Sequence, residues 1–146
     1  MRNFYLTASF VFILDRLTKY LVLLADYQRI ELLPFLALVK VWNRGVAFGL
    51  FSSADSANFI FTMATALALG FIFYISKKAK GFERIGFGLI FGGALGNLVD
   101  RIVLGGVLDF IDLHAGSLHW PAFNVADLGI TIGVAVFAFT YFKKKA

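Results

Sequence analysis

GGALGNLVDRIVLGGVLDFIDL, residues 92–113, begins as an apolar, glycine-rich stretch that suits a membrane helix. Five polar or charged residues then follow in the same stretch: Asn97, Asp100, Arg101, Asp109 and Asp112. A charged side chain near the centre of a bilayer costs about 2.5 to 3.5 kcal/mol even on the scale derived from insertion experiments. Each of these residues therefore needs a partner, a route to water or a chemical task.

The rest of the chain is equally apolar. Its 146 residues are 60% hydrophobic and 16% charged, with a mean hydropathy of +0.80, which excludes an ordinary soluble domain. Because a membrane helix needs about 20 apolar residues, four windows predict four transmembrane helices in one domain, 1–146. The windows are about 4–24, 57–75, 85–104 and 123–142.

The basic residues predict how the helices are oriented. Lysine and arginine collect near span ends on the cytoplasmic side, and here they gather at Arg2, in 77–84 and in 143–145. The connection 105–122 contains no lysine or arginine. Both termini are therefore expected in the cytoplasm, and the net charge of +5 indicates contact with lipid headgroups rather than with nucleic acid.

Two further patterns concern structure alone. The stretch 35–51 alternates in polarity around a turn signal at Asn43–Gly45, which predicts a small β-hairpin on the extracytoplasmic side, between the first and second helices. The fold class expected is thus all-α with a small β-cradle. Glycines recur every four residues in the third and fourth windows, which favours close helix packing: Gly88, Gly92 and Gly96, then Gly129 and Gly133.

The charges inside the predicted helices can be partly paired. Asp15 and Lys19 are four residues apart and share a helix face, so an ion pair is expected, while Arg16 is expected to turn outward. Asp100 and Arg101 could form a structural ion pair. The planar guanidinium of Arg101 could also hold a substrate carbonyl or a tetrahedral oxyanion.

Asp109 and Asp127 form the most informative pair. Asp109 follows the third predicted helix and Asp127 lies about one turn into the fourth, so two antiparallel neighbours bring both carboxylates to similar depth. Two carboxylates in one low-dielectric site share a proton and titrate as a unit. One can then act as general base and the other as general acid in peptide hydrolysis.

No metal or cofactor is expected. The chain has no cysteine, which excludes disulfides, thiolate nucleophiles and thiolate metal sites. Its two histidines, His114 and His119, lie in the loop after Asp109, so a histidine–carboxylate metal site is conceivable there, but it lacks an organised ligand spacing.

Five strings of the chain together resemble those of bacterial lipoprotein signal peptidase, also called signal peptidase II. They occur in that family's order and span nearly the whole chain, although D-x-x-T-K alone would be weak evidence. The strings are DRLTK at 15–19, NRGVAFG at 43–49, GNLVDR at 96–101, VLDF at 107–110 and FNVAD at 123–127.

The resemblance implies a cofactor-free aspartic endopeptidase of the bacterial inner membrane, whose site lies near the extracytoplasmic surface. It would remove signal peptides from prolipoproteins, cutting before the diacylglyceryl-modified cysteine, and it would be a target of globomycin. We expect it to act as a monomer among membrane lipids. The family's dyad maps onto Asp109 and Asp127. Its substrate-contacting or supporting residues would be Asn43, Asn97, Arg101 and Asn124, with Asp15, Lys19 and Asp100 holding the site together.

Two alternatives stay open from the residues alone. A small proton-coupled transporter subunit would also carry aspartate, arginine and lysine within the membrane, but it is expected to show internal repeats and broken helices. A purely structural membrane subunit would leave the polar cluster unexplained.

Overall fold

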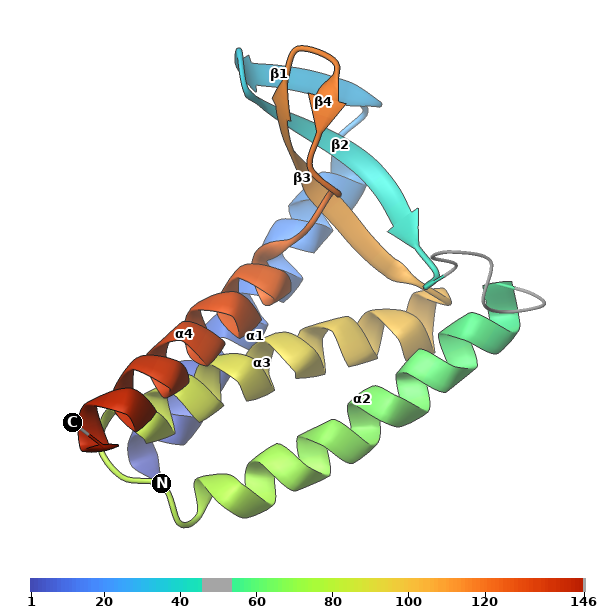
Figure 1. The fold of residues 1–146 in the computed structure, drawn as a ribbon. Coiled ribbons are helices and arrows are strands. Elements are labelled where there is room, and N and C mark those ends of the chain that lie inside the picture. Colours follow the sequence, from blue (N-terminus) through green and yellow to red (C-terminus); the bar gives the residue numbers. More distant parts are fainter. Residues whose placement is uncertain (46–53, 146) are drawn as a thin grey trace.

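The computed structural model describes residues 1–45 and 54–145, which form four long helices and a small sheet at one end of them (Figure 1). The helices overlap the four predicted windows closely and confirm them as helical. They are α1 (Arg2–Leu24), α2 (Ala54–Ser76), α3 (Phe82–Leu104) and α4 (Val125–Lys145).

The helices differ in how well they suit a bilayer. Within the described ranges, three are long and apolar enough to cross a membrane, and these are α2, α3 and α4. The first helix, α1, has 23 residues but carries Asp15, Arg16 and Lys19 in its second half. Burial of Asp15 and Lys19 within the protein removes both charges from the outer surface of α1.

Helix α3 lies at the centre and packs against each of the other three. Its glycines allow close approach, which confirms the packing predicted for them. A Cβ added at Gly88 would lie 2.6 Å from the carbonyl oxygen of Phe4 in α1, and one added at Gly133 of α4 would lie 2.7 Å from that of Gly86. These contacts let α1 and α4 come within reach of the polar residues of α3.

The sheet differs from the expected hairpin. Its four strands run in the order β1–β2–β3–β4, and every neighbouring pair is antiparallel. Half of it comes from the connection between α3 and α4, which was expected to be a loop. The strands are β1 (Arg29–Leu33), β2 (Leu36–Asn43), β3 (Val107–Ala115) and β4 (Leu118–His119).

The prediction that Asn43–Gly45 forms the turn of the first hairpin was also wrong. Strand β2 contains the first arm of the predicted hairpin, but it pairs with β1 through a turn at Pro34 and Phe35. Its other edge pairs with β3. The predicted second arm, 46–53, lies outside the described residues.

Strand β3 is fixed to the helices by its apolar face. Leu108 and Phe110 are buried together with Val22 near the end of α1. Because side chains alternate along a strand, Asp109 between them points to the opposite face, toward β2 and the start of α4. The sheet therefore presents an aspartate to the helix ends.

Candidate active site

Asp127 is positioned by the start of α4. The side-chain Oδ1 of Asn124 accepts a hydrogen bond from the backbone N–H of Asp127 at 3.0 Å, and Asp127 Oδ2 accepts one from the backbone N–H of Asn124 at 3.1 Å. This reciprocal pair is a capping box, with asparagine and aspartate as its two members. The fold of the first helical turn thus fixes where the Asp127 carboxylate lies.

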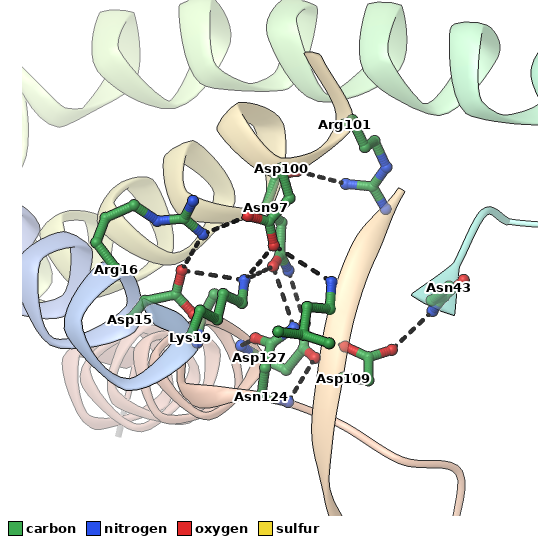
Figure 2. Close-up of polar contacts among 12 residues, drawn as sticks. Asp15, Arg16, Lys19, Asn43, Asn97, Asp100, Arg101, Asp109, Asn124 and Asp127 are labelled. Atoms are coloured by element: carbon green, nitrogen blue, oxygen red, sulfur yellow. Dashed lines mark hydrogen bonds and ion pairs between the residues drawn. The ribbon is translucent and has the colours of Figure 1, made fainter. Parts of the chain in front are cut away.

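Asp109 is held by two amides from different elements. Its Oδ2 accepts a hydrogen bond from Asn43 Nδ2 at the end of β2, at 3.1 Å, and its Oδ1 accepts one from Asn124 Nδ2 at 2.7 Å. Asp109 is only 2% exposed. Since Asn124 also caps α4, one asparagine fixes both carboxylates (Figure 2).

Asn97 of α3 completes the amide framework. Its Nδ2 donates to Asp127 Oδ1 at 2.8 Å. Its Oδ1 accepts hydrogen bonds from Lys19 Nζ at 2.9 Å and from Asn124 Nδ2 at 3.2 Å. These donors fix the orientation of the Asn97 amide, so that its N–H points at the carboxylate. Helices α1, α3 and α4 are thereby joined at the carboxylate pair.

Below the amides lies a cluster of charges, the four-residue ion network of Asp15, Arg16, Lys19 and Asp100. Lys19 Nζ lies 3.0 Å from Asp15 and 2.7 Å from Asp100, which confirms the predicted pairing of Asp15 with Lys19. Arg16 bridges the same two aspartates at 2.8 and 2.6 Å. Asp15 also accepts a hydrogen bond from the backbone N–H of Ala126 in α4. Two cations and two anions therefore neutralise one another.

Two predictions about this network were wrong. Asp100 pairs with Arg16 and Lys19 of α1, rather than with its neighbour Arg101. Arg16, which was expected to turn outward without a role, spans both aspartates instead. The physical reason is the same in both cases, because α1 and α3 pack closely enough for charges on different helices to meet.

Arg101 stands apart from the ion network. Its guanidinium donates to the backbone carbonyl of Asn97 at 3.4 Å and lies 5.8 Å from the ring centroid of Phe61. It also interacts electrostatically with Asp127 and Asp109. Figure 2 shows its side chain on the same side of the site as Asp109. Arg101 is therefore close enough to both carboxylates for their charges to interact.

The surroundings of Asp109 favour its neutral form. Burial raises the pKa of Asp109 to about 6, and the nearby charge of Asp127 adds to this rise. Hydrogen bonds from Asn43 and Asn124 lower its pKa, and so does the charge of Lys19, but burial dominates. A carboxyl group that titrates near neutral pH can exchange a proton during a reaction.

Each carboxylate of the pair lines a cleft. A cleft of about 480 Å³ is lined by Asp109, together with Trp42 and Pro121. A second one, of about 350 Å³, is lined by Asp127 with Phe123 and Leu128. Both members of the pair are therefore open to a neighbouring hollow of the surface.

The structure thus brings together the predicted site residues: Asp15, Lys19, Asn43, Asn97, Asp100, Arg101, Asp109, Asn124 and Asp127. The structure adds Arg16 to this group. The sequence pattern that could have identified Arg16 is D-R-x-x-K, in which two cations lie near one anion. The structure also places Asp112, His114 and His119 together on the sheet, outside this site.

Known proteins share this sequence and fold. A family model described as signal peptidase (SPase) II matches residues 7–143. The lipoprotein signal peptidase of Anaplasma phagocytophilum is 42% identical over 93% of this chain and 89% of its own length, and that of Pelagibacter ubique is 46% identical over 92% and 86%.

One solved structure, described as a bacterial membrane enzyme determined by the in meso method at 2.3 Å resolution, is also similar to this chain. It superposes with a TM-score of 0.80 at 34% identity, covering 100% of this chain and 91% of that one. The helices and sheet described above are therefore those of a membrane enzyme, and this chain belongs to the signal peptidase II family.

Proposed function

We propose that this chain removes signal peptides from prolipoproteins as an aspartic endopeptidase, with Asp109 and Asp127 as its dyad. Family membership supports the substrate class. The observation that carries the mechanism is the shared amide, because Asn124 donates to Asp109 and caps the helix that bears Asp127. No other pair of carboxylates among the described residues combines this shared amide with a cleft at each of its two members.

In this mechanism the two carboxylates hold one proton between them. The ionised member takes a proton from water as the water oxygen attacks the peptide carbonyl. The protonated member donates to the carbonyl oxygen, and a proton is later passed to the leaving nitrogen. The rise of the Asp109 pKa to about 6 supports such sharing, because the fully ionised pair is disfavoured.

Arg101 and the amides would position the substrate. Arg101 has donors beside the carboxylates, which suits it to a substrate carbonyl or to the charge that develops on its oxygen. Asn43 ends strand β2 next to the first cleft, where a peptide backbone would pass. Asp15, Lys19 and Asp100 would act through Asn97 and α4 rather than on the substrate itself.

The substrate proposed is a precursor whose cysteine carries a diacylglyceryl group, cut on the N-terminal side of that cysteine. Acyl chains can stay in the bilayer while the peptide lies across the helix ends beneath the sheet. The apolar side chains around Asp127, from Phe123 and Leu128, suit such a neighbour. Water would reach the peptide bond because Asp127 lies in the first turn of α4 and Asp109 on the strand that precedes this helix.

The proposed topology has four spans, including α1, in the bacterial inner membrane. Both termini would be cytoplasmic, the sheet and site would face outward, and residues 1–146 would act as one monomeric domain that globomycin inhibits. Because the chain has no cysteine, labelling of a single introduced cysteine shows on which side of the membrane that residue lies. Leu118→Cys should react with an impermeant thiol reagent added to intact cells, whereas Lys80→Cys should react only after lysis.

The direct test of function compares two precursors. Purified protein is incubated with a diacylated prolipoprotein and with the same chain without lipid, and cleavage is followed as a shift on a gel. We expect cleavage of the diacylated form alone, with inhibition by globomycin. Equal cutting of both forms would contradict the proposed substrate, and an absence of cutting in both would contradict the proposed activity.

A further inference from the structure

A group of metal-ligand side chains lies on the sheet, away from the carboxylate pair. Asp112 and His114 belong to β3, and His119 belongs to β4. The ligand atoms of all three lie within 4.8 Å of one another. The sequence separates His119 from Asp112 by a tight turn, so only the pairing of β3 with β4 brings the three together.

The distances fit one ion. His119 Nδ1 lies 3.0 Å from Asp112 Oδ1, and His114 Nδ1 lies 3.7 Å from Asp112 Oδ2. Ligands of a tetrahedral zinc ion with bonds of about 2.0 to 2.1 Å are about 3.4 Å apart, a value between these two separations. A small inward movement of the half-exposed His119 ring would complete the set.

A second, independent observation is that one ring nitrogen of His114 lacks a hydrogen-bond partner. Its side chain is 10% exposed, and its Nδ1 is buried without a hydrogen-bond partner. Its other nitrogen, Nε2, lies 3.4 Å from Glu31 on β1. A carboxylate that accepts the Nε2–H of a histidine leaves Nδ1 with a free lone pair, which is how such carboxylates orient histidines that bind metal.

The charge balance also permits a cation. Arg29 donates to Asp112 Oδ2 at 2.7 Å and to Glu31 at 2.6 Å, so its charge is already shared by two carboxylates. Both oxygens of Asp112 lie 3.0 Å from His119 Nδ1, so an ion bound there would replace the hydrogen bond between this nitrogen and the carboxylate. A cleft of about 400 Å³ beside the histidines opens a route to it.

We propose that Asp112, His114 and His119 bind a divalent transition metal ion, with Glu31 orienting His114. Two imidazole nitrogens and one carboxylate oxygen are the donors that Zn²⁺ prefers, and water would supply the remaining position. The ion would join β4 to β3 and would take no part in peptide cleavage. This inference does not depend on the proposed function.

The binding test uses the full chain purified without a histidine tag and stripped of metal by a chelator. Titration with Zn²⁺ in a calorimeter should show one ion per chain, whereas Mg²⁺ and Ca²⁺, which prefer sites made only of oxygen ligands, should not bind. His114→Gln and His119→Gln should each abolish this binding. Glu31→Gln should weaken it by about tenfold or more, as removal of an orienting carboxylate does.

Two control variants locate the ion. Asp26→Asn changes an exposed carboxylate outside the cluster, and Asp127→Asn removes one member of the carboxylate pair; both should bind Zn²⁺ as the wild type does.

Cleavage of a lipidated precursor by the two histidine variants would show that they are folded. Co²⁺ bound to the unmodified chain should give the visible absorption of a tetrahedral site, which needs no variant. Unchanged Zn²⁺ binding in the histidine variants, or no Zn²⁺ binding by the wild type, would overturn the proposal.

Discussion

The ion network and the carboxylate pair lie next to each other and are built from the same kind of residue, yet they differ in their partners. Asp15 and Asp100 each contact two cations, Arg16 and Lys19. Asp109 and Asp127 receive their hydrogen bonds from neutral amides. An aspartate paired with cations has its charge balanced within the protein and serves the structure. One held only by amides can still gain or lose a proton, so it can serve chemistry.

The sharpest way to test this difference is to neutralise one member of the carboxylate pair. Asp127→Asn keeps the shape of the side chain but removes its acid–base function, so the rate of precursor cleavage should fall by roughly 10³-fold or more. Asp109→Asn should do the same. Cleavage is measured on a lipidated precursor, and helical content by circular dichroism. Retained cleavage in either variant would remove that residue from the dyad.

The complementary change is made in the ion network. Lys19→Met leaves Asp15 and Asp100 with one cation between them, and loss of one partner of a buried ion pair costs about 3 to 5 kcal/mol. The free energy of unfolding in micelles should therefore decrease strongly. Lys40→Met, in which the lysine contacts a backbone carbonyl and an aromatic ring and forms no ion pair among the described residues, is the matched control. Equal stability of the two variants would show that the network contributes nothing.

A milder change modifies the pair without removing it. Asn43→Ala deletes the amide that donates to Asp109 Oδ2, a hydrogen bond that lowers the pKa of Asp109. The pKa of Asp109 should rise above about 6, and since a charge-assisted hydrogen bond is worth about 1.5 to 3 kcal/mol, by roughly one unit or more. The pH dependence of cleavage should shift to higher pH. An unshifted profile with a lower rate would indicate that Asn43 contacts the substrate instead.

The smallest expected effect is on thermal stability. The folded pKa of Asp109 is about 6, above the ordinary value of about 3.9, so the folded state holds this proton more tightly. Its contribution to stability is complete below about pH 4 and is lost as the pH rises through about 6. The unfolding temperature of the wild type should therefore drop between about pH 4 and about pH 7 by more than that of Asp109→Asn. Equal decreases in the unfolding temperatures of the two proteins would contradict the raised pKa of Asp109.

The helices were predictable from the sequence, and the sheet was only partly so. A long apolar stretch in a membrane protein leaves few options besides a helix, because its backbone must pair internally. Strand pairing depends instead on residues distant in sequence. The register that joins β2 to β3 could not be inferred from local patterns, and Asn43–Gly45 gave a stronger turn signal than Pro34.

The site residues followed from their types and order, but several contacts did not. Asp109 and Asp127 were recognisable because unpaired carboxylates are costly near a membrane. Arg16 was missed because one helix was considered alone, whereas its partner Asp100 lies on another. The grouping of His114 with Asp112 needed the strand pairing as well.

The double role of Asn124 has a consequence for biosynthesis. The same amide begins the last helix and holds Asp109. A nascent chain whose final helix has not yet entered the bilayer lacks this cap and the second carboxylate together. If Asp109 and Asp127 form the proposed dyad, such an unfinished chain cannot hydrolyse neighbouring proteins, because both carboxylates come together only when insertion is complete.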